Sequence, residues 1–138
     1  MINDVLIVDD EHTIVDLVRS VLQEAGYDCC AAYDGESALL AIEAARPALV
    51  LLDVHLPGLS GLEVAAQLRR HNLSHVPVIL MTADAATAER LPTPAFPEYL
   101  VKPFGIESLL GCVRRSLQRA GRTMHKASGY NGMAISRR

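Results

Sequence analysis

Five polar residues with complementary chemistry follow short apolar runs of this 138-residue chain. Asp9 and Asp10 come after the first run, Asp53 after a later one, and Thr82 and Lys102 after two more. Three carboxylates, a hydroxyl and an ammonium can together bind a divalent cation and act on a phosphoryl group. They form a site only if the fold brings them to one place.

The acidic members of this set need positive charge around them. Clustered carboxylates repel one another, and each has a raised pKa unless a cation lies nearby. Lys102 supplies one charge, and Mg²⁺ would supply the rest, because it favours a few carboxylates, a carbonyl and retained waters. The three aspartates and the backbone carbonyl near His55 fit that demand. A carboxylate beside a metal can also attack phosphorus and become an aspartyl phosphate.

The alternative interpretation is that these polar residues are merely solvated, as loop residues usually are. For any one of them alone we favour that alternative. For five of them at successive strand ends, the combination favours a site.

The elements that must position these residues alternate along the chain. Apolar runs predict strands over residues 5–8, 27–33, 48–52, 78–81 and 98–101. Helical spacing predicts helices over residues 14–25, 37–45, 60–71, 85–91 and 106–117. This alternation predicts an α/β fold, a doubly wound parallel sheet with helices on both faces. Ligands of such sheets bind beyond the carboxyl ends of the strands, where all five polar residues fall.

Four motifs at these strand ends are specific in combination. They are residues 6–11 (LIVDDE), 51–61 (LLDVHLPGLSG), 81–83 (MTA) and 99–104 (YLVKPF). Together they resemble the receiver domain of two-component response regulators, over about residues 3–119. The resemblance implies a five-stranded sheet of flavodoxin-like order 2-1-3-4-5.

The resemblance also implies roles for the acidic residues. Asp53 matches the aspartate that accepts a phosphoryl group from a phosphohistidine of a sensor kinase or phosphotransfer protein. Asp10, Asp53 and the carbonyl of His55 match the Mg²⁺ ligands. Asp9 would contribute directly or through water.

The remaining roles concern the response to phosphorylation. Thr82 and Lys102 match the pair that contacts the phosphoryl oxygens, and Tyr99 matches an aromatic residue whose rotamer follows the threonine. The resemblance further implies a cis Lys102–Pro103 bond. Charge added at Asp53 would draw Thr82 toward it, and Tyr99 would fill the vacated space and change the affinity for a protein partner.

One segment departs from the family's pattern. Pro92, Pro94 and Pro97 fall where the family has most of its fourth helix, and proline interrupts helices. We expect a shortened, proline-interrupted fourth helix over 85–91. Whether the Tyr99 switch works beside this segment stays open, as does the family's usual dimer.

Two positions near the acceptor could set the lifetime of an aspartyl phosphate. His55 and Asp84 lie two residues beyond Asp53 and Thr82, where side chains in this family approach the attacking water. Asp84 could orient that water or repel it. The alternative, that both side chains simply face solvent, is equally open.

Charge is divided unevenly along the chain. The first 119 residues hold all 16 acidic residues and nine of the 13 basic ones, a net charge of −7, whereas the last nineteen carry +4. We expect a receiver domain over 1–119 and a flexible basic tail over 120–138. The overall charge of −3 gives no basic field for nucleic acid. We therefore expect no direct nucleic-acid binding by this chain.

The remaining features place the protein in a class. The start of the chain lacks the basic leader of a signal peptide, and no apolar run approaches the ~20 residues of a spanning helix. The cysteines at 29, 30 and 112 form no disulfide framework, and we expect them as small core residues. A cytoplasmic protein without membrane contact is the prediction.

The function that these observations favour is a phosphoryl-accepting switch rather than a true enzyme. It would take phosphate onto Asp53 with Mg²⁺, lose it slowly by hydrolysis, and bind a downstream protein. An aspartate-nucleophile phosphatase is one alternative, although its usual Asp-x-Asp motif is missing. A binding module independent of phosphorylation is another. The cognate kinase, the target, the oligomeric state, and whether the chain stands alone or belongs to a longer regulator are left open.

Overall fold

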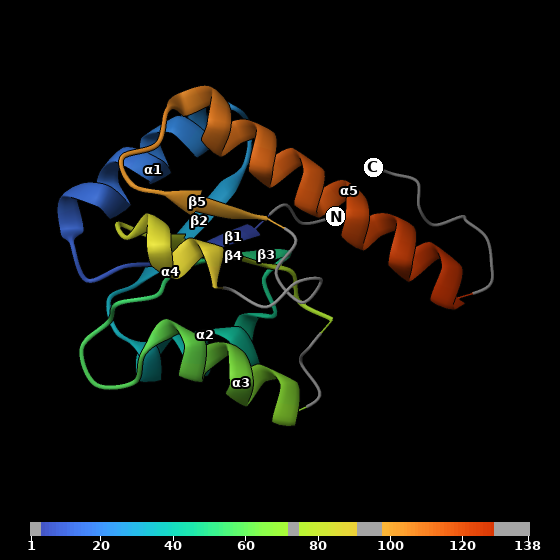
Figure 1. The fold of residues 1–138 in the computed structure, drawn as a ribbon. Helices are drawn as coiled ribbons and strands as arrows, with labels where there is room; N and C mark the ends of the chain where they lie inside the picture. The colour runs from blue at the N-terminus through green and yellow to red at the C-terminus, as the bar shows by residue number, and fades with distance from the viewer. Residues whose placement is uncertain (1–3, 72–74, 91–97, 129–138) are drawn as a thin grey trace.

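The computed structural model describes residues 4–71, 75–90 and 98–128, with side chains described as far as residue 121. Five strands alternate with five helices in this part of the chain (Figure 1). The strands are β1 (Asp4–Val8), β2 (Asp28–Ala32), β3 (Leu49–Asp53), β4 (Val78–Thr82) and β5 (Tyr99–Val101). The helices are α1 (His12–Glu24), α2 (Gly35–Ala45), α3 (Gly61–Arg70), α4 (Ala85–Glu89) and α5 (Ile106–Ser128).

All strand pairs are parallel, and the strand order is β2-β1-β3-β4-β5. In Figure 1, α1 and α5 lie over one face of this sheet and α2 and α3 over the other. The expected doubly wound sheet and its strand order are therefore confirmed. The order reverses between β1 and β3, so the carboxyl ends of these two strands flank the crevice where ligands bind in such sheets.

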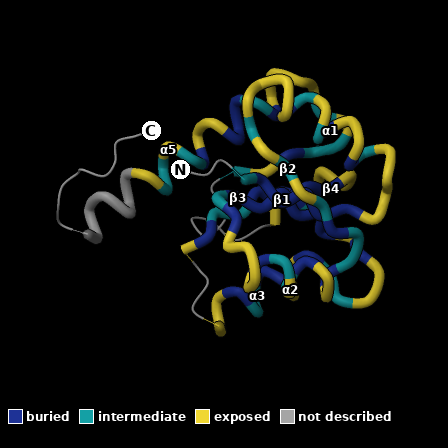
Figure 2. Tube along the Cα trace, turned by 180° about the vertical axis from the view of Figure 1, so that it is seen from behind, coloured by how far each residue is buried: buried dark blue, intermediate teal, exposed yellow. Residues whose placement is uncertain are grey.

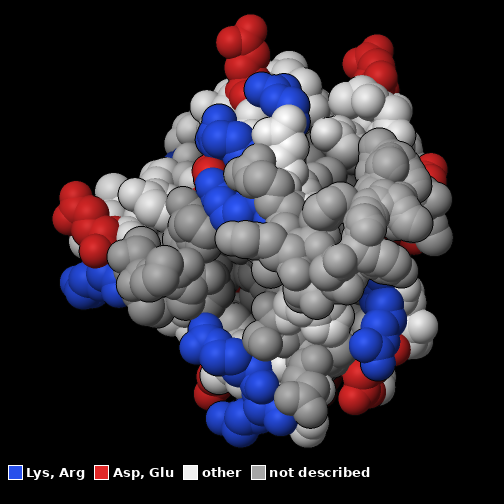
Figure 3. All heavy atoms as spheres, turned by 90° about the vertical axis from the view of Figure 1, so that its right-hand side faces the viewer, with Lys and Arg blue, Asp and Glu red and all other residues white. Residues whose placement is uncertain are grey.

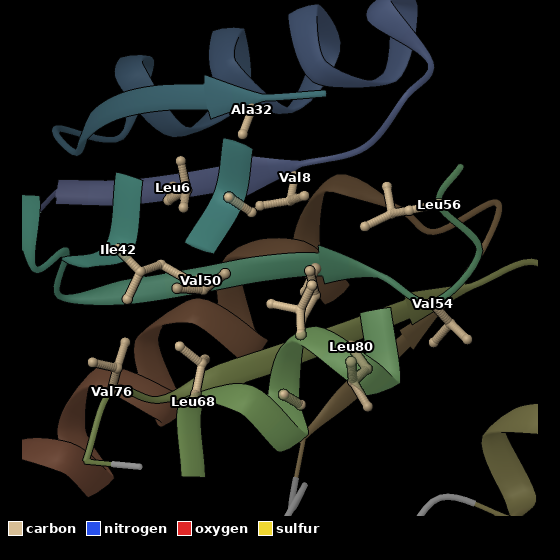
Figure 4. Close-up of a cluster of buried hydrophobic side chains, with 14 residues drawn as sticks. Leu6, Val8, Ala32, Ile42, Val50, Val54, Leu56, Leu68, Val76 and Leu80 are labelled. Atoms are coloured by element: carbon tan, nitrogen blue, oxygen red, sulfur yellow. The ribbon is translucent and has the colours of Figure 1, made fainter. Parts of the chain in front are cut away.

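Two apolar cores follow from the alternation of side chains along the central strands. In β1, Val5 and Ile7 pack toward α1 and α5, whereas Leu6 and Val8 pack toward α2 and α3. Figure 4 shows the second of these clusters, in which strand residues meet Ile42 of α2. Since both faces are covered, the central strands β1, β3 and β4 are almost entirely buried, as the dark blue trace in Figure 2 shows. This explains why the strands form continuous apolar runs in the sequence.

Local signals in the sequence set several helix ends. Ser60 and Glu63 form the expected capping box at the start of α3, with the Ser60 Oγ accepting the Glu63 N–H at 3.2 Å and the Glu63 Oε1 accepting the Ser60 N–H at 2.9 Å. Gly26 follows α1 with a φ of 101°, a left-handed conformation that favours glycine. These caps fix where α1 ends and where α3 begins.

The expectation that all three cysteines lie in the core is wrong for one of them. Cys112 is buried, Cys29 is half-buried and Cys30 is exposed. The reason is that β2 lies at the edge of the sheet, with an alternating pattern of burial in place of complete burial. Cys29 packs against the apolar cluster beneath α1 and α5, whereas Cys30 points to the opposite face and is exposed.

Two expectations concern the ends of α4 and α5. The described α4 ends at Glu89, and Pro92, Pro94 and Pro97 lie outside the described residues. Helix α5 continues past the expected boundary at 119 to Ser128, so residues 120–128 are helical where we expected a flexible tail. The rest of the expected tail lies outside the described residues, and the domain boundary stays a prediction.

Candidate functional site

The register of β1 and β3 brings the three aspartates together. Val8 pairs with Leu52, so that Asp9 and Asp10 follow one strand beside Asp53 at the end of the other. Carboxylate oxygens of the three residues lie within 4.8 Å of one another. Asp9 and Asp53 are buried, whereas Asp10 is exposed, which leaves the acidic cluster open to solvent on one side.

Lys102 reaches this cluster from the far end of the chain. Its Nζ donates to the Asp9 Oδ2 at 2.7 Å and lies 3.5 Å from the Asp53 Oδ2 and 3.5 Å from the Glu11 Oε1. The backbone N–H of Lys102 donates to the carbonyl oxygen of Thr82 at 2.7 Å, which fixes the end of β5 beside the end of β4. The Lys102–Pro103 bond is cis, as expected.

Burial and neighbouring charges raise the pKa values of both Asp53 and Lys102, for different reasons. Burial, followed by the charge of Asp9, raises the pKa of Asp53 to about 6, although Lys102 opposes the shift. Burial lowers the pKa of Lys102, but its hydrogen bond to Asp9 and the charges of Asp53 and Glu11 outweigh that effect and raise it. Lys102 therefore stays an ammonium, and Asp53 is largely a carboxylate at neutral pH.

Backbone groups hold the buried carboxylates in place. The Asp9 Oδ1 accepts the N–H of Glu11 at 3.0 Å, and the Asp53 Oδ1 accepts the N–H of His55 at 3.3 Å. Behind Asp53, Gly61 at the start of α3 packs so closely that a Cβ there would collide with the Asp53 carbonyl oxygen. The capped start of α3 thus packs directly against the backbone of Asp53.

The donor set fits a divalent cation. Three carboxylates and one ammonium leave a net charge of about −2 at the site, which a divalent ion would balance. Carboxylate oxygens and a backbone carbonyl such as that of His55 are ligands of the kind Mg²⁺ prefers. The arrangement can therefore hold a metal ion beside a buried carboxylate, with an ammonium on its other side.

Thr82 and Tyr99 occupy the neighbouring strands. Thr82 ends β4, is fully buried, and its Oγ1 accepts the N–H of Asp84 at 3.1 Å. Tyr99 begins β5 opposite Leu80, is 40% exposed and lies outside the acidic cluster. The structure thus brings together Asp9, Asp10, Asp53 and Lys102, and places Thr82 on the strand next to Asp53.

Two residues have contacts that the sequence interpretation did not assign. Glu11 contacts Lys102, a role that its place beside Asp9 and Asp10 could have indicated. Asp84 is the N-cap of α4, which its position just before the helix could have indicated. Of the two positions expected near the attacking water, His55 is exposed, and the Asp84 carboxylate accepts a hydrogen bond from the Ala86 N–H in the first turn of α4.

Comparison with known proteins identifies the family. The sequence model of the response regulator receiver domain matches residues 5–114, most of the chain. The chain belongs to the response regulator receiver domain family. This receiver domain is 37% identical over 118 residues to the alkaline phosphatase synthesis transcriptional regulatory protein PhoP of Bacillus subtilis, covering 84% of this chain and 49% of PhoP. It is equally identical over 118 residues to the DNA-binding response regulator MtrA of Mycobacterium tuberculosis, covering 83% of this chain and 50% of MtrA.

Solved structures match the receiver domain over its whole fold. The response regulator TrrA of Thermotoga maritima, solved in complex with Mg²⁺–BeF, is 38% identical with a TM-score of 0.75, covering 83% of this chain and 98% of that one. The receiver domain of Francisella response regulator 1452 is 29% identical with a TM-score of 0.78, covering 85% of this chain and 98% of that one. The expected family and fold are therefore confirmed together.

The receiver domain spans about half the length of the curated relatives that it matches, and those relatives are named transcriptional or DNA-binding regulators. On the face in Figure 3, the described basic side chains lie in several separate places with acidic side chains between them. The absence of nucleic-acid binding stays a prediction. Among the described residues, no helix is both long enough and apolar enough to cross a bilayer.

Proposed function

We propose that this receiver domain is a signalling switch that accepts a phosphoryl group on Asp53. The observation that carries the proposal is the position of Asp53, a buried carboxylate 3.5 Å from the Lys102 ammonium with two further aspartates beside it. A phosphoryl group brings negative charge to this place, and both the ammonium and a bound cation would neutralise that charge. A merely structural ion pair would need only one carboxylate.

The transfer step is a substitution at phosphorus. A carboxylate oxygen of Asp53 attacks the phosphorus of a phosphohistidine, the phosphorus–nitrogen bond breaks, and the departing imidazole takes up a proton. A pKa of about 6 keeps most Asp53 carboxyls in the nucleophilic, ionised form at neutral pH. Lys102, anchored by Asp9, is placed to neutralise an equatorial phosphoryl oxygen.

The metal site supports the same step. Mg²⁺, held by Asp9, Asp10 and Asp53 with the carbonyl of His55, would supply the remaining positive charge on the phosphoryl oxygens. Asp10 faces solvent, so it can take up the ion without the cost of desolvating a further buried carboxylate. Asp9 is already shared with Lys102, and we assign it a direct or water-mediated contact.

The product of the transfer would change the protein's binding properties. The Thr82 hydroxyl would turn toward a phosphoryl oxygen, and the half-exposed Tyr99 would adjust to the change. We propose a histidine kinase or phosphotransfer protein as the donor, and a second protein as the downstream partner. Slow hydrolysis of the acyl phosphate by water would reset the switch, and the cytoplasm is the expected location.

The test is the intact mass of the full chain after incubation with acetyl phosphate and Mg²⁺. We expect the wild-type chain to gain one phosphoryl group. No gain is expected when EDTA is present during the incubation, or in Asp53→Asn. Asp16→Asn, a matched change of an exposed carboxylate on α1, should still gain the group. No gain by the wild-type chain at saturating donor would refute the proposal and favour a module that binds independently of phosphorylation. Rapid turnover of many phosphomonoesters would instead support the phosphatase.

A further inference from the structure

Asp84 uses both carboxylate oxygens to bind the start of α4. Its Oδ1 accepts the N–H of Ala86 at 3.0 Å, and its Oδ2 accepts the Thr87 hydroxyl at 2.9 Å. The hydrogen bond from Thr87, followed by that from Ala86, lowers the pKa of this carboxyl. The carboxylate is therefore committed to α4, although sequence position alone places it near the water that would attack an aspartyl phosphate.

The backbone of the same residue binds Thr82. The N–H of Asp84 donates to the Thr82 Oγ1 at 3.1 Å. Thr82 is fully buried, and its carbonyl oxygen is fixed by the N–H of Lys102. The backbone of Thr82 is thus held, and its hydroxyl can turn toward Asp53 only by giving up the hydrogen bond from Asp84.

We propose that Asp84 is a positioning residue for Thr82. Its carboxylate caps α4 and thereby keeps its backbone N–H hydrogen-bonded to the Thr82 hydroxyl. This hydrogen bond restrains the hydroxyl from turning toward a phosphoryl group on Asp53. This inference rests on the proposed phosphoryl acceptor role of Asp53. When Thr82 turns, the Asp84 N–H loses its acceptor and the first turn of α4 loosens. Asp84 thereby links the phosphorylation site to α4 by a route that does not need Tyr99.

Three substitutions separate this role from an effect of charge. Asp84→Asn removes the charge but keeps an oxygen that caps a helix about as well, whereas Asp84→Ala removes both. Asp34→Ala is the matched control, because Asp34 caps α2 with its Oδ1, which accepts the Ser37 N–H at 2.7 Å. Helix α2 packs against β1 and β2, away from Thr82.

The first measurement is the rate of phosphoryl gain from acetyl phosphate with Mg²⁺, followed by intact mass. We expect Asp84→Ala to gain the group at least threefold faster than the wild type, because its Thr82 is less restrained. Asp84→Asn and Asp34→Ala should stay within twofold of the wild type. Equal acceleration in the Asn and Ala variants would assign the effect to charge and overturn the inference. An unchanged rate in Asp84→Ala, or acceleration in Asp34→Ala, would overturn it as well.

The second measurement does not depend on phosphorylation. In the unmodified protein, Thr82→Val removes the acceptor of the Asp84 N–H, whereas Thr82→Ser keeps it. Amide hydrogen exchange followed by NMR should become at least fivefold faster at Asp84 and at Ala86 in the Val variant, and stay near the wild-type rate in the Ser variant. Unchanged exchange at Ala86 would refute the link from Thr82 to α4. Failure of the wild type to gain a phosphoryl group would refute only the acceptor role of Asp53.

Discussion

Removing the charge of Asp53 should stabilise the metal-free protein, although it abolishes the proposed function. Burial and the nearby Asp9 raise the pKa of Asp53 from 3.8 to about 6, so the folded protein binds this carboxylate's proton more tightly than the unfolded chain does. About two pKa units at roughly 1.4 kcal/mol each set an upper limit of about 3 kcal/mol. An asparagine in Asp53→Asn loses part of the attraction to Lys102, and we expect a net gain of about 1–3 kcal/mol at pH 7.

The stabilisation by Asp53→Asn should depend on pH, because the pKa of Asp53 is higher in the folded protein than in the unfolded chain. The cost of ionising Asp53 is absent below about pH 4, where the carboxyl is protonated in both states, and it is complete above about pH 6. The difference in unfolding free energy between Asp53→Asn and the wild type should therefore be small at pH 4 and grow up to pH 7.

Urea unfolding in EDTA between pH 4 and pH 8 measures this difference directly. Asp16→Asn, which removes an exposed charge on α1, should leave the unfolding free energy within about 0.5 kcal/mol of the wild type. An Asp53→Asn variant that is less stable than the wild type at pH 7, or a difference that does not change with pH, would refute the reasoning. The first result would mean that Lys102 overcompensates for the burial of the carboxylate, and the second that the pKa of Asp53 is the same in the folded and unfolded states.

Three further measurements test other parts of the structure. Mg²⁺ at 100 times its Kd should raise the unfolding free energy of the wild type by about 3 kcal/mol, and less so in Asp53→Asn, whereas equal gains would contradict the metal site. Glu98→Gln should cost about 1 kcal/mol at pH 7, because Glu98 accepts two hydrogen bonds from the exposed Arg115, at 3.0 and 3.1 Å. Chiefly these bonds lower the pKa of Glu98 to about 2, so its contribution to the free energy of unfolding should disappear as the pH falls from 4.5 toward 2. A destabilisation by Glu98→Gln that does not change with pH in urea unfolding would argue against the ion pair. Gly61→Ala should lower the free energy of unfolding by about 1–3 kcal/mol and slow phosphoryl gain at Asp53, because a Cβ there collides with the Asp53 backbone. Gly121→Ala, where a Cβ meets open space, should be neutral or stabilising. Equal effects of the two substitutions in thermal unfolding would disprove the close approach of Gly61.

The fold could be predicted because its signals are local. Apolar runs such as residues 5–8 and 49–52 are buried on both faces, and no amphipathic alternative competes with them. The site followed from the same pattern, because the ends of parallel strands meet at one edge whatever the details of packing.

What could not be predicted depends on contacts between distant residues. The edge position of β2, which exposes Cys30, is a property of strand order rather than of the strand's own residues. The ion pairs of Glu98 with Arg115 and Arg119 join the residue just before β5 to α5 across about twenty residues of sequence. The start of α4 at Ala85 agrees with the prediction, but the hydrogen bond from the Asp84 N–H to the Thr82 Oγ1 depends on the rotamer of Thr82, which the sequence pattern does not define.

Helix α5 has a mechanical consequence. At 1.5 Å per residue, the eleven steps from Leu117 to Ser128 make an arm about 16 Å long, and Figure 1 shows this half of the helix extending beyond the sheet. A tilt of about 5° at Leu117 would displace the tip by about 1.4 Å, although the pivot itself does not move. A probe attached at the Ser128 end of α5 would therefore magnify small rearrangements of β5 and α5, whereas at the exposed Gly121, about 6 Å from Leu117, the same tilt gives only about 0.5 Å. Such a probe would report on the proposed switch by displacement rather than by chemistry.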